Sequence, residues 1–123
     1  MIEAYSEAID VVAGAFIPFN NVTLKKGCTV ELTGPSSVQF NKCGVYMVSF
    51  KGSATEATTV QLYKDGIAQP QAQAIGTEPS FVTLVQVAEN NTCCPCSSPT
   101  ICQVISEDAT TFNAADITVT KVV

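Results

Sequence analysis

Short runs of β-branched and aromatic residues recur along the whole chain, separated by residues that favour turns. The clearest run spans residues 44–50 and reads GVYMVSF, so Tyr46, Val48 and Phe50 share one face of an extended strand. Met47 makes the opposite face partly apolar as well. Both faces of this strand are therefore expected to be covered.

The same pattern predicts short strands, with turn signals at Thr33-Gly34-Pro35 and at Asp65-Gly66. Ile2, Tyr5 and Ile9 have helical spacing, but so short a segment does not form a stable helix alone. Many short strands are typical of a β-sandwich or a barrel. They are expected at Asp10–Phe19, Cys28–Leu32, Ser37–Phe40, Val45–Ala54, Thr58–Lys64, Ala72–Ile75, Phe81–Ala88, Thr100–Ser106 and Asp116–Val122.

Length and composition indicate one domain that hides additional surface in an oligomer. The chain has 123 residues, of which 46% are hydrophobic and only 14% charged, against about a quarter charged in an average domain. The net charge of −5 disfavours nucleic acid as a partner, and Lys25-Lys26, the only basic pair, is expected to be a solvated turn. No apolar run reaches the roughly 18 residues of a membrane-spanning helix, so no membrane insertion is expected. The first ten residues contain three acids and no lysine, which does not fit a signal peptide.

The residue types present argue against the common catalytic arrangements. The sequence contains no histidine and no arginine, so it lacks the usual near-neutral base and the usual phosphate clamp. Glu107-Asp108, the only adjacent acidic pair, is expected to be a solvated turn. We therefore expect neither catalytic residues nor a cofactor.

Four segments together resemble a known superfamily. They are residues 13–20 (AGAFIPFN), residues 38–50 around VQFN and GVYMVSF, residues 60–66 (VQLYKDG) and residues 113–122 (NAADITVTKV). Their order and character are similar to the strands of the tumour necrosis factor and complement globular-head superfamily. Within it the chain most resembles the trimeric heads of bacterial collagen-like spore-surface glycoproteins and related phage fibre or decoration domains, although it lacks their Gly-X-Y stalk.

This resemblance implies an all-β fold, a ten-strand jelly-roll sandwich that packs as a homotrimer with apolar residues on the threefold axis. The jelly roll is expected over residues 10–123, and residues 1–9 are expected to be an N-terminal arm that docks to a larger particle. Residues 82, 84, 85 and 87 are apolar on both faces of their strand, so either face could line the axis. Candidates for the core or the trimer contact are Tyr46, Val48, Phe50, Phe81, Leu84 and Val85.

The six cysteines allow several interpretations. A hairpin around Gly34 would bring Cys28 opposite Cys43 and favour a disulfide between them. The other four, Cys93, Cys94, Cys96 and Cys102, could form further disulfides, remain free thiols or bind zinc, although their spacing lacks the paired C-x-x-C pattern of structural zinc sites. No histidine or arginine is present to lower a thiol pKa for redox catalysis.

These observations predict a non-enzymatic trimeric module displayed on a surface. The interpretation that we favour is a bacteriophage virion decoration or fibre-head protein, whose loops contact a surface glycan or a protein receptor. A spore-coat or exosporium protein of the same fold is the alternative. A small metal- or redox-active protein that uses the Cys93–Cys102 loop is the third.

Overall fold

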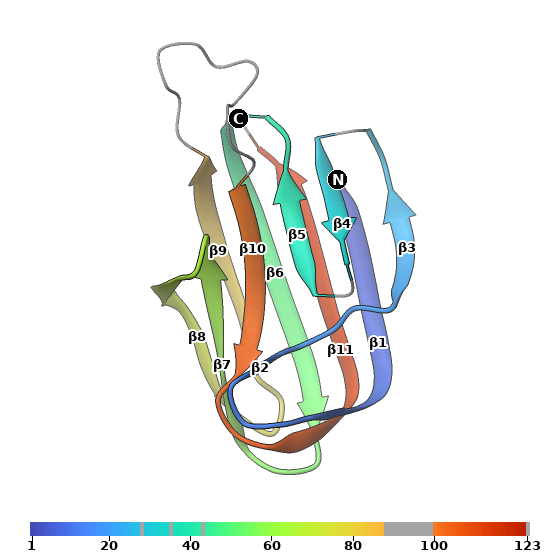
Figure 1. Ribbon diagram of the computed structural model, residues 1–123, viewed down its shortest axis with the longest axis vertical. Helices are drawn as coiled ribbons and strands as arrows, with labels where there is room; N and C mark the ends of the chain where they lie inside the picture. Colours follow the sequence, from blue (N-terminus) through green and yellow to red (C-terminus); the bar gives the residue numbers. More distant parts are fainter. Residues whose placement is uncertain (28, 35, 43, 88–99, 123) are drawn as a thin grey trace.

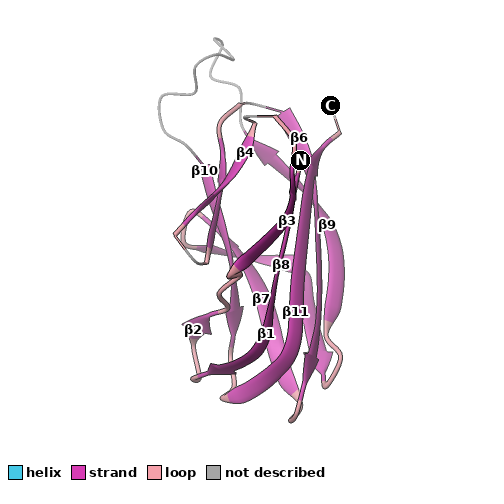
Figure 2. Ribbon diagram, turned by 90° about the vertical axis from the view of Figure 1, so that its right-hand side faces the viewer, coloured by secondary structure: helices cyan, strands magenta, loops and turns pink. Residues whose placement is uncertain are grey.

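The computed structural model of this protein describes residues 1–27, 29–34, 36–42, 44–87 and 100–122. In these ranges the chain forms two antiparallel sheets that lie face to face as the layers of a sandwich (Figures 1 and 2). Sheet A has the strand order β3-β1-β11-β6-β9, and sheet B has the order β4-β5-β10-β7-β8, with the short β2 paired to β10. The strands are β1 (Ile2–Val11), β2 (Ala15–Phe16), β3 (Asn21–Lys25), β4 (Val30–Thr33), β5 (Ser37–Phe40), β6 (Gly44–Ala54), β7 (Thr58–Lys64), β8 (Ile67–Gly76), β9 (Ser80–Val87), β10 (Thr100–Ser106) and β11 (Thr110–Lys121).

Neighbouring strands in each sheet come from distant parts of the chain. β1 pairs with β11, β6 lies between β11 and β9, and β10 lies between β5 and β7. Connections that cross repeatedly between two antiparallel sheets are typical of a jelly roll. The predicted all-β jelly-roll fold is therefore confirmed. Within the described ranges there is no helix with the length and apolar character that crossing a membrane requires.

Most of the predicted strands agree closely with the observed ones. β5, β7 and β10 begin and end at the predicted residues, and the bounds of β4, β6 and β9 differ by one or two residues. β8 and β11 begin earlier than predicted, and the single strand expected over Asp10–Phe19 is instead the end of β1 followed by β2. β3 was not predicted.

Residues 1–9 are not an arm outside the jelly roll. They form most of β1, which is hydrogen-bonded to β11 on one side and to β3 on the other. Ile2 and Ala4 are buried in the core, because alternate residues of this strand face sheet B. The expectations of an arm and of a domain boundary at residue 10 are therefore corrected, and the helical spacing seen in this segment has no structural counterpart.

The core lies between the sheets and includes two groups of aromatic rings. The ring centroid of Phe50 lies 6.3 Å from that of Phe19 and 5.5 Å from that of Phe81. The second group pairs Tyr46 with Phe40, whose ring centroids lie 4.5 Å apart, and the Tyr46 hydroxyl donates a hydrogen bond of 2.5 Å to the Lys42 carbonyl. Each buried aromatic side chain contributes on the order of 2 to 3 kcal/mol through removal of apolar surface from water.

The β7–β8 hairpin carries the predicted two-residue turn and an irregularity next to it. Asp65 and Gly66 both have positive φ, as a type I′ turn requires, and Lys64 pairs with Ile67 across them. Further along, the pairing shifts register between Gln61 and Tyr63. The shift leaves backbone carbonyls of β8 without strand partners, so a side chain must satisfy them.

Gln61 supplies that side chain. Its Nε2 carries two N–H donors that serve three carbonyls, so one N–H is shared: those of Leu62 at 3.1 Å, Ala72 at 3.2 Å, and Gln69. Gln61 is buried although it is polar, which these hydrogen bonds explain.

Candidate subunit-contact face

The outward face of sheet A exposes large apolar side chains that the core of one subunit does not use. On β9, Val82 and Leu84 are 64% and 60% exposed, and Leu84 pairs across the sheet with Met47 of β6, which is 36% exposed. We call the outward face of sheet A the contact face. Neighbouring exposed apolar residues of this kind are typical of a surface that contacts another molecule.

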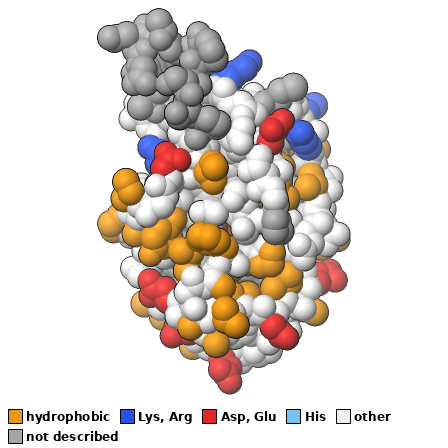
Figure 3. Space-filling model, in the orientation of Figure 1, with side chains coloured by type: hydrophobic (Ala, Val, Ile, Leu, Met, Phe, Trp, Pro, Cys, Tyr) orange, Lys and Arg blue, Asp and Glu red, His pale blue; other side chains and the backbone are white. Residues whose placement is uncertain are grey.

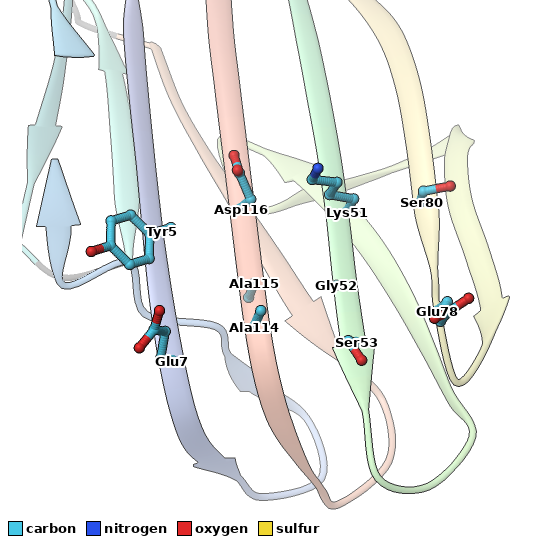
Figure 4. A pocket seen from close by; sticks show the side chains of 10 residues that line it. All are labelled: Tyr5, Glu7, Lys51, Gly52, Ser53, Glu78, Ser80, Ala114, Ala115 and Asp116. Atoms are coloured by element: carbon cyan, nitrogen blue, oxygen red, sulfur yellow. The ribbon is translucent and has the colours of Figure 1, made fainter. Parts of the chain in front are cut away.

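A pocket of about 490 Å³ opens on the same face of sheet A (Figure 4). Its floor consists of small residues, Gly52, Ser53, Ala114 and Ala115, at the point where the β11–β6 pairing shifts register. Its walls are formed by Tyr5, Glu7, Lys51, Glu78, Ser80 and Asp116. Gly52 and Ala115 face the core and direct no side chain into the pocket, and the outward Ala114 is shorter than the wall residues, so the sheet is hollowed here.

Four wall residues form a row across sheet A. Tyr5 of β1 pairs with Asp116 of β11, Asp116 pairs with Lys51 of β6, and Lys51 pairs with Ser80 of β9. Figure 4 shows these side chains on the same side of the ribbon. Glu7 lies two residues beyond Tyr5 on β1, so it projects from the same face.

The pocket is electrostatically unfavourable for the carboxylate of Asp116. Partial burial, followed by the negative charge of Glu3, raises the pKa of Asp116 above its ordinary value, while Lys51 acts in the opposite direction. Glu3 accepts hydrogen bonds from the hydroxyls of Thr23 at 2.8 Å and Thr118 at 3.3 Å. The charged residues that line the pocket are Glu7, Glu78 and Asp116 against Lys51, so carboxylates outnumber ammonium groups there.

Charge is also unevenly distributed along the length of the sandwich (Figure 3). Most lysines lie toward one end, at the upper strand ends of Figure 1: Lys25, Lys26, Lys42, Lys64 and Lys121. Acidic residues lie near the strand ends of the opposite end: Asp10, Glu56, Glu78, Glu107 and Asp108. Lysines therefore gather toward one end, and several acidic residues gather toward the other.

Comparison with known proteins identifies the architecture. No family model matches this sequence, and no curated protein matches it. Among solved structures, the globular domain of zebrafish complement 1qA protein superposes with a TM-score of 0.76 at 8% identity, covering 99% of this chain and 96% of that one. PRD1 vertex protein P5 superposes with a TM-score of 0.68 at 10% identity, covering 99% of this chain and 96% of that one. Rabbit GITRL superposes with a TM-score of 0.63 at 11% identity, covering 100% of this chain and 95% of that one. This chain has the complement-head and tumour necrosis factor-like jelly-roll fold. None of these three names is that of an enzyme.

Within this jelly roll, the predicted core and contact residues separate into two sets. Tyr46, Val48, Phe50, Phe81 and Val85 all face sheet B and are buried. Leu84 alone lies on the contact face. Val85, which the sequence suggested for the trimer axis, is 3% exposed and belongs to the core, because β9 turns its odd-numbered residues inward.

The pocket residues of the jelly roll were missed by the sequence analysis. Tyr5, Glu7, Lys51 and Asp116 come from three strands and meet only through the β1–β11–β6 pairing. Alternation of Glu3, Tyr5 and Glu7 was the available signal, but it lay in the segment interpreted as an arm.

The cysteine predictions are tested only at Cys102. Cys28, Cys43, Cys93, Cys94 and Cys96 lie outside the described residues, and with them the predicted Cys28–Cys43 disulfide. Cys102 is a free, fully buried thiol on the inward face of β10. Burial, with a smaller contribution from Asp65, raises its pKa to about 12, which disfavours the thiolate that zinc binding or thiol exchange requires. Among the described residues, no three side chains of the metal-binding types come together.

Proposed function

We propose that this protein is a non-enzymatic homotrimeric head that decorates a bacteriophage virion or forms the head of a virion fibre. The observation that carries the proposal is the contact face, where Val82, Leu84 and Met47 remain exposed although the core between the sheets is complete. Association of subunits through this face would remove these side chains from water.

A closed ring of three subunits suits such a face. Cyclic packing uses the same surface of every subunit and leaves no free contact from which a fibre could grow. The threefold arrangement is the one that the sequence resemblance implies. The fold likeness to complement 1qA and to GITRL supports it, since both superpose over nearly the whole chain.

The virion assignment is supported by the likeness to PRD1 vertex protein P5, a phage vertex protein. Because residues 1–9 belong to sheet A, attachment to the particle is not assigned to an N-terminal arm. The uneven distribution of lysines and acidic residues between the two ends would allow one end to face the particle and the other to face a glycan or protein receptor.

The trimer is tested by sedimentation equilibrium of the wild type, Leu84→Asp and Ile75→Asp. Ile75 is a matched control, because it is 75% exposed but lies on β8 of sheet B. We expect a trimer for the wild type and for Ile75→Asp, and a folded monomer for Leu84→Asp. A monomeric wild type, or equal dissociation of both variants, would contradict the proposed face.

The virion role is tested on particles. Antibodies raised against the recombinant protein should label purified virions in immunogold electron microscopy, and mass spectrometry of those virions should detect the chain. Labelling of spores in place of virions would replace the virion proposal with the spore-coat alternative.

A further inference from the structure

The acidic pocket and the apolar residues of the contact face belong to one continuous surface. Val82 pairs with Ser49 and Ser80 pairs with Lys51, so the exposed apolar positions of β9 lead directly into the pocket row along β6 and β9. A subunit that covers Val82 and Leu84 would therefore also cover the pocket or its rim.

We propose that this pocket makes subunit association proton-linked, so that subunits associate more tightly as the pH falls through the carboxylate range. The inference rests on the proposed trimer contact through the outward face of sheet A. It goes beyond that proposal by identifying what controls the strength of the contact.

Charged groups from several elements lie near Asp116 on the contact face. Glu3 of β1 and Lys51 of β6 act on its carboxylate, and Glu7 of β1 and Glu78, which precedes β9, line the same pocket. This part of the surface therefore carries four carboxylates, including that of Asp116, and the ammonium group of Lys51. When they are ionised, the surface that must lose water carries an excess of negative charge, and each neighbouring subunit carries the same excess.

Covering this surface disfavours the ionised carboxylates for two reasons. Removal of water raises the free energy of each charged carboxylate, and similar negative charges on adjacent subunits repel one another. Burial and the charge of Glu3 already raise the pKa of Asp116 in the single subunit, and further burial by a neighbouring subunit acts in the same direction. The associated state therefore binds protons more tightly than the free subunit does.

The sign follows from linkage. If association takes up protons, the association constant rises as the pH falls, by about tenfold per pH unit for each proton taken up. The penalty is largest, and association weakest, when Asp116 is charged. Because the pKa of Asp116 is raised above its ordinary value, its protonation as the pH falls removes part of the penalty.

The experiment measures association constants by sedimentation equilibrium between pH 5.0 and pH 7.5 at fixed ionic strength. The variants are Asp116→Asn, Lys51→Gln and, as a matched control, Glu107→Gln, which removes the same charge from a turn outside the contact face. Circular dichroism checks that each variant is folded.

We expect wild-type association to be at least tenfold tighter at pH 5.0 than at pH 7.5. Asp116→Asn should associate more tightly than the wild type at pH 7.5 and depend less on pH. Lys51→Gln should associate more weakly at pH 7.5, because the carboxylates lose their only cation, and Glu107→Gln should behave as the wild type.

Two outcomes overturn the inference, and they can be told apart. A wild-type trimer whose association does not change with pH, or changes equally in the wild type and Asp116→Asn, refutes the proton linkage while the trimer stands. A wild type that stays monomeric at every pH refutes both the trimer and the linkage.

Discussion

Adjacent residues on β9 should respond in opposite ways to the same substitution. Val85 is 3% exposed between the sheets, whereas Leu84 is 60% exposed on the contact face. We therefore expect Val85→Asp to prevent folding near neutral pH and Leu84→Asp to leave the subunit folded. The comparison tests the register of sheet A directly.

The expected magnitude at Val85 follows from what the substitution buries. Loss of the valine side chain costs about 2 kcal/mol of apolar burial. An unpaired carboxylate in the core adds several kcal/mol, or forces the group to take up a proton. The sum, about 5 kcal/mol or more, is comparable with the whole stability of a small domain, which is about 5 to 15 kcal/mol.

At Leu84 the carboxylate stays in water, and the free energy of unfolding of the single subunit should change by only about 1 kcal/mol. The assay is urea unfolding followed by circular dichroism at several protein concentrations, so that dissociation is separated from unfolding. The milder substitutions Leu84→Ala and Val85→Ala provide a control, and only Val85→Ala should lose about 2 kcal/mol. Equal destabilisation of the two positions would refute the inward and outward assignment of β9.

Three further predictions concern the stability and reactivity of the fold. Gln61→Leu should lower the free energy of unfolding by about 1 to 3 kcal/mol, because the carbonyls of Gln69 and Ala72 lose their hydrogen-bond donor. Urea unfolding measures the change, with Gln73→Leu at an exposed position as the control. Cys102 should resist iodoacetamide at pH 8 in the native protein and react after denaturation, because burial raises its pKa to about 12 and keeps the thiol protonated. Tandem mass spectrometry locates the label, and rapid labelling of the native protein would contradict the burial of Cys102. Deletion of residues 1–9 should abolish cooperative thermal unfolding, because it removes most of β1 from sheet A. A truncated chain that still melts cooperatively would show that the fold does not require these residues.

The sequence by itself determined the fold class and several strands. Runs of strand-forming residues between turn signals placed β5, β7 and β10 at their observed bounds. Asp65-Gly66 determined the β7–β8 turn, because positive φ suits those two residues. These features depend on local periodicity and local backbone preferences, which neighbouring residues express without the rest of the chain.

Only the tertiary structure decided the role of the first strand and the orientation of β9. β1 pairs with residues 110–119 of β11, and its first residue, Ile2, lies opposite Val119. The two strands come from opposite ends of the sequence, so no local pattern could identify the partner of β1. β9 is apolar at consecutive positions, so alternation could not show whether Leu84 or Val85 faces inward. Packing against sheet B settles that choice, because a one-residue change of register exchanges the two faces of a strand.

The pocket depends on tertiary structure for the same reason. Its charged wall residues are ordinary surface residues in the sequence. The pKa of Asp116 is raised only in the folded sheet, where burial and then the negative charge of Glu3 act on its carboxylate. The contact face likewise exists only after five strands align their outward positions. Local sequence therefore specifies which segments become strands, and the long-range pairing of those strands determines which side chains share a surface.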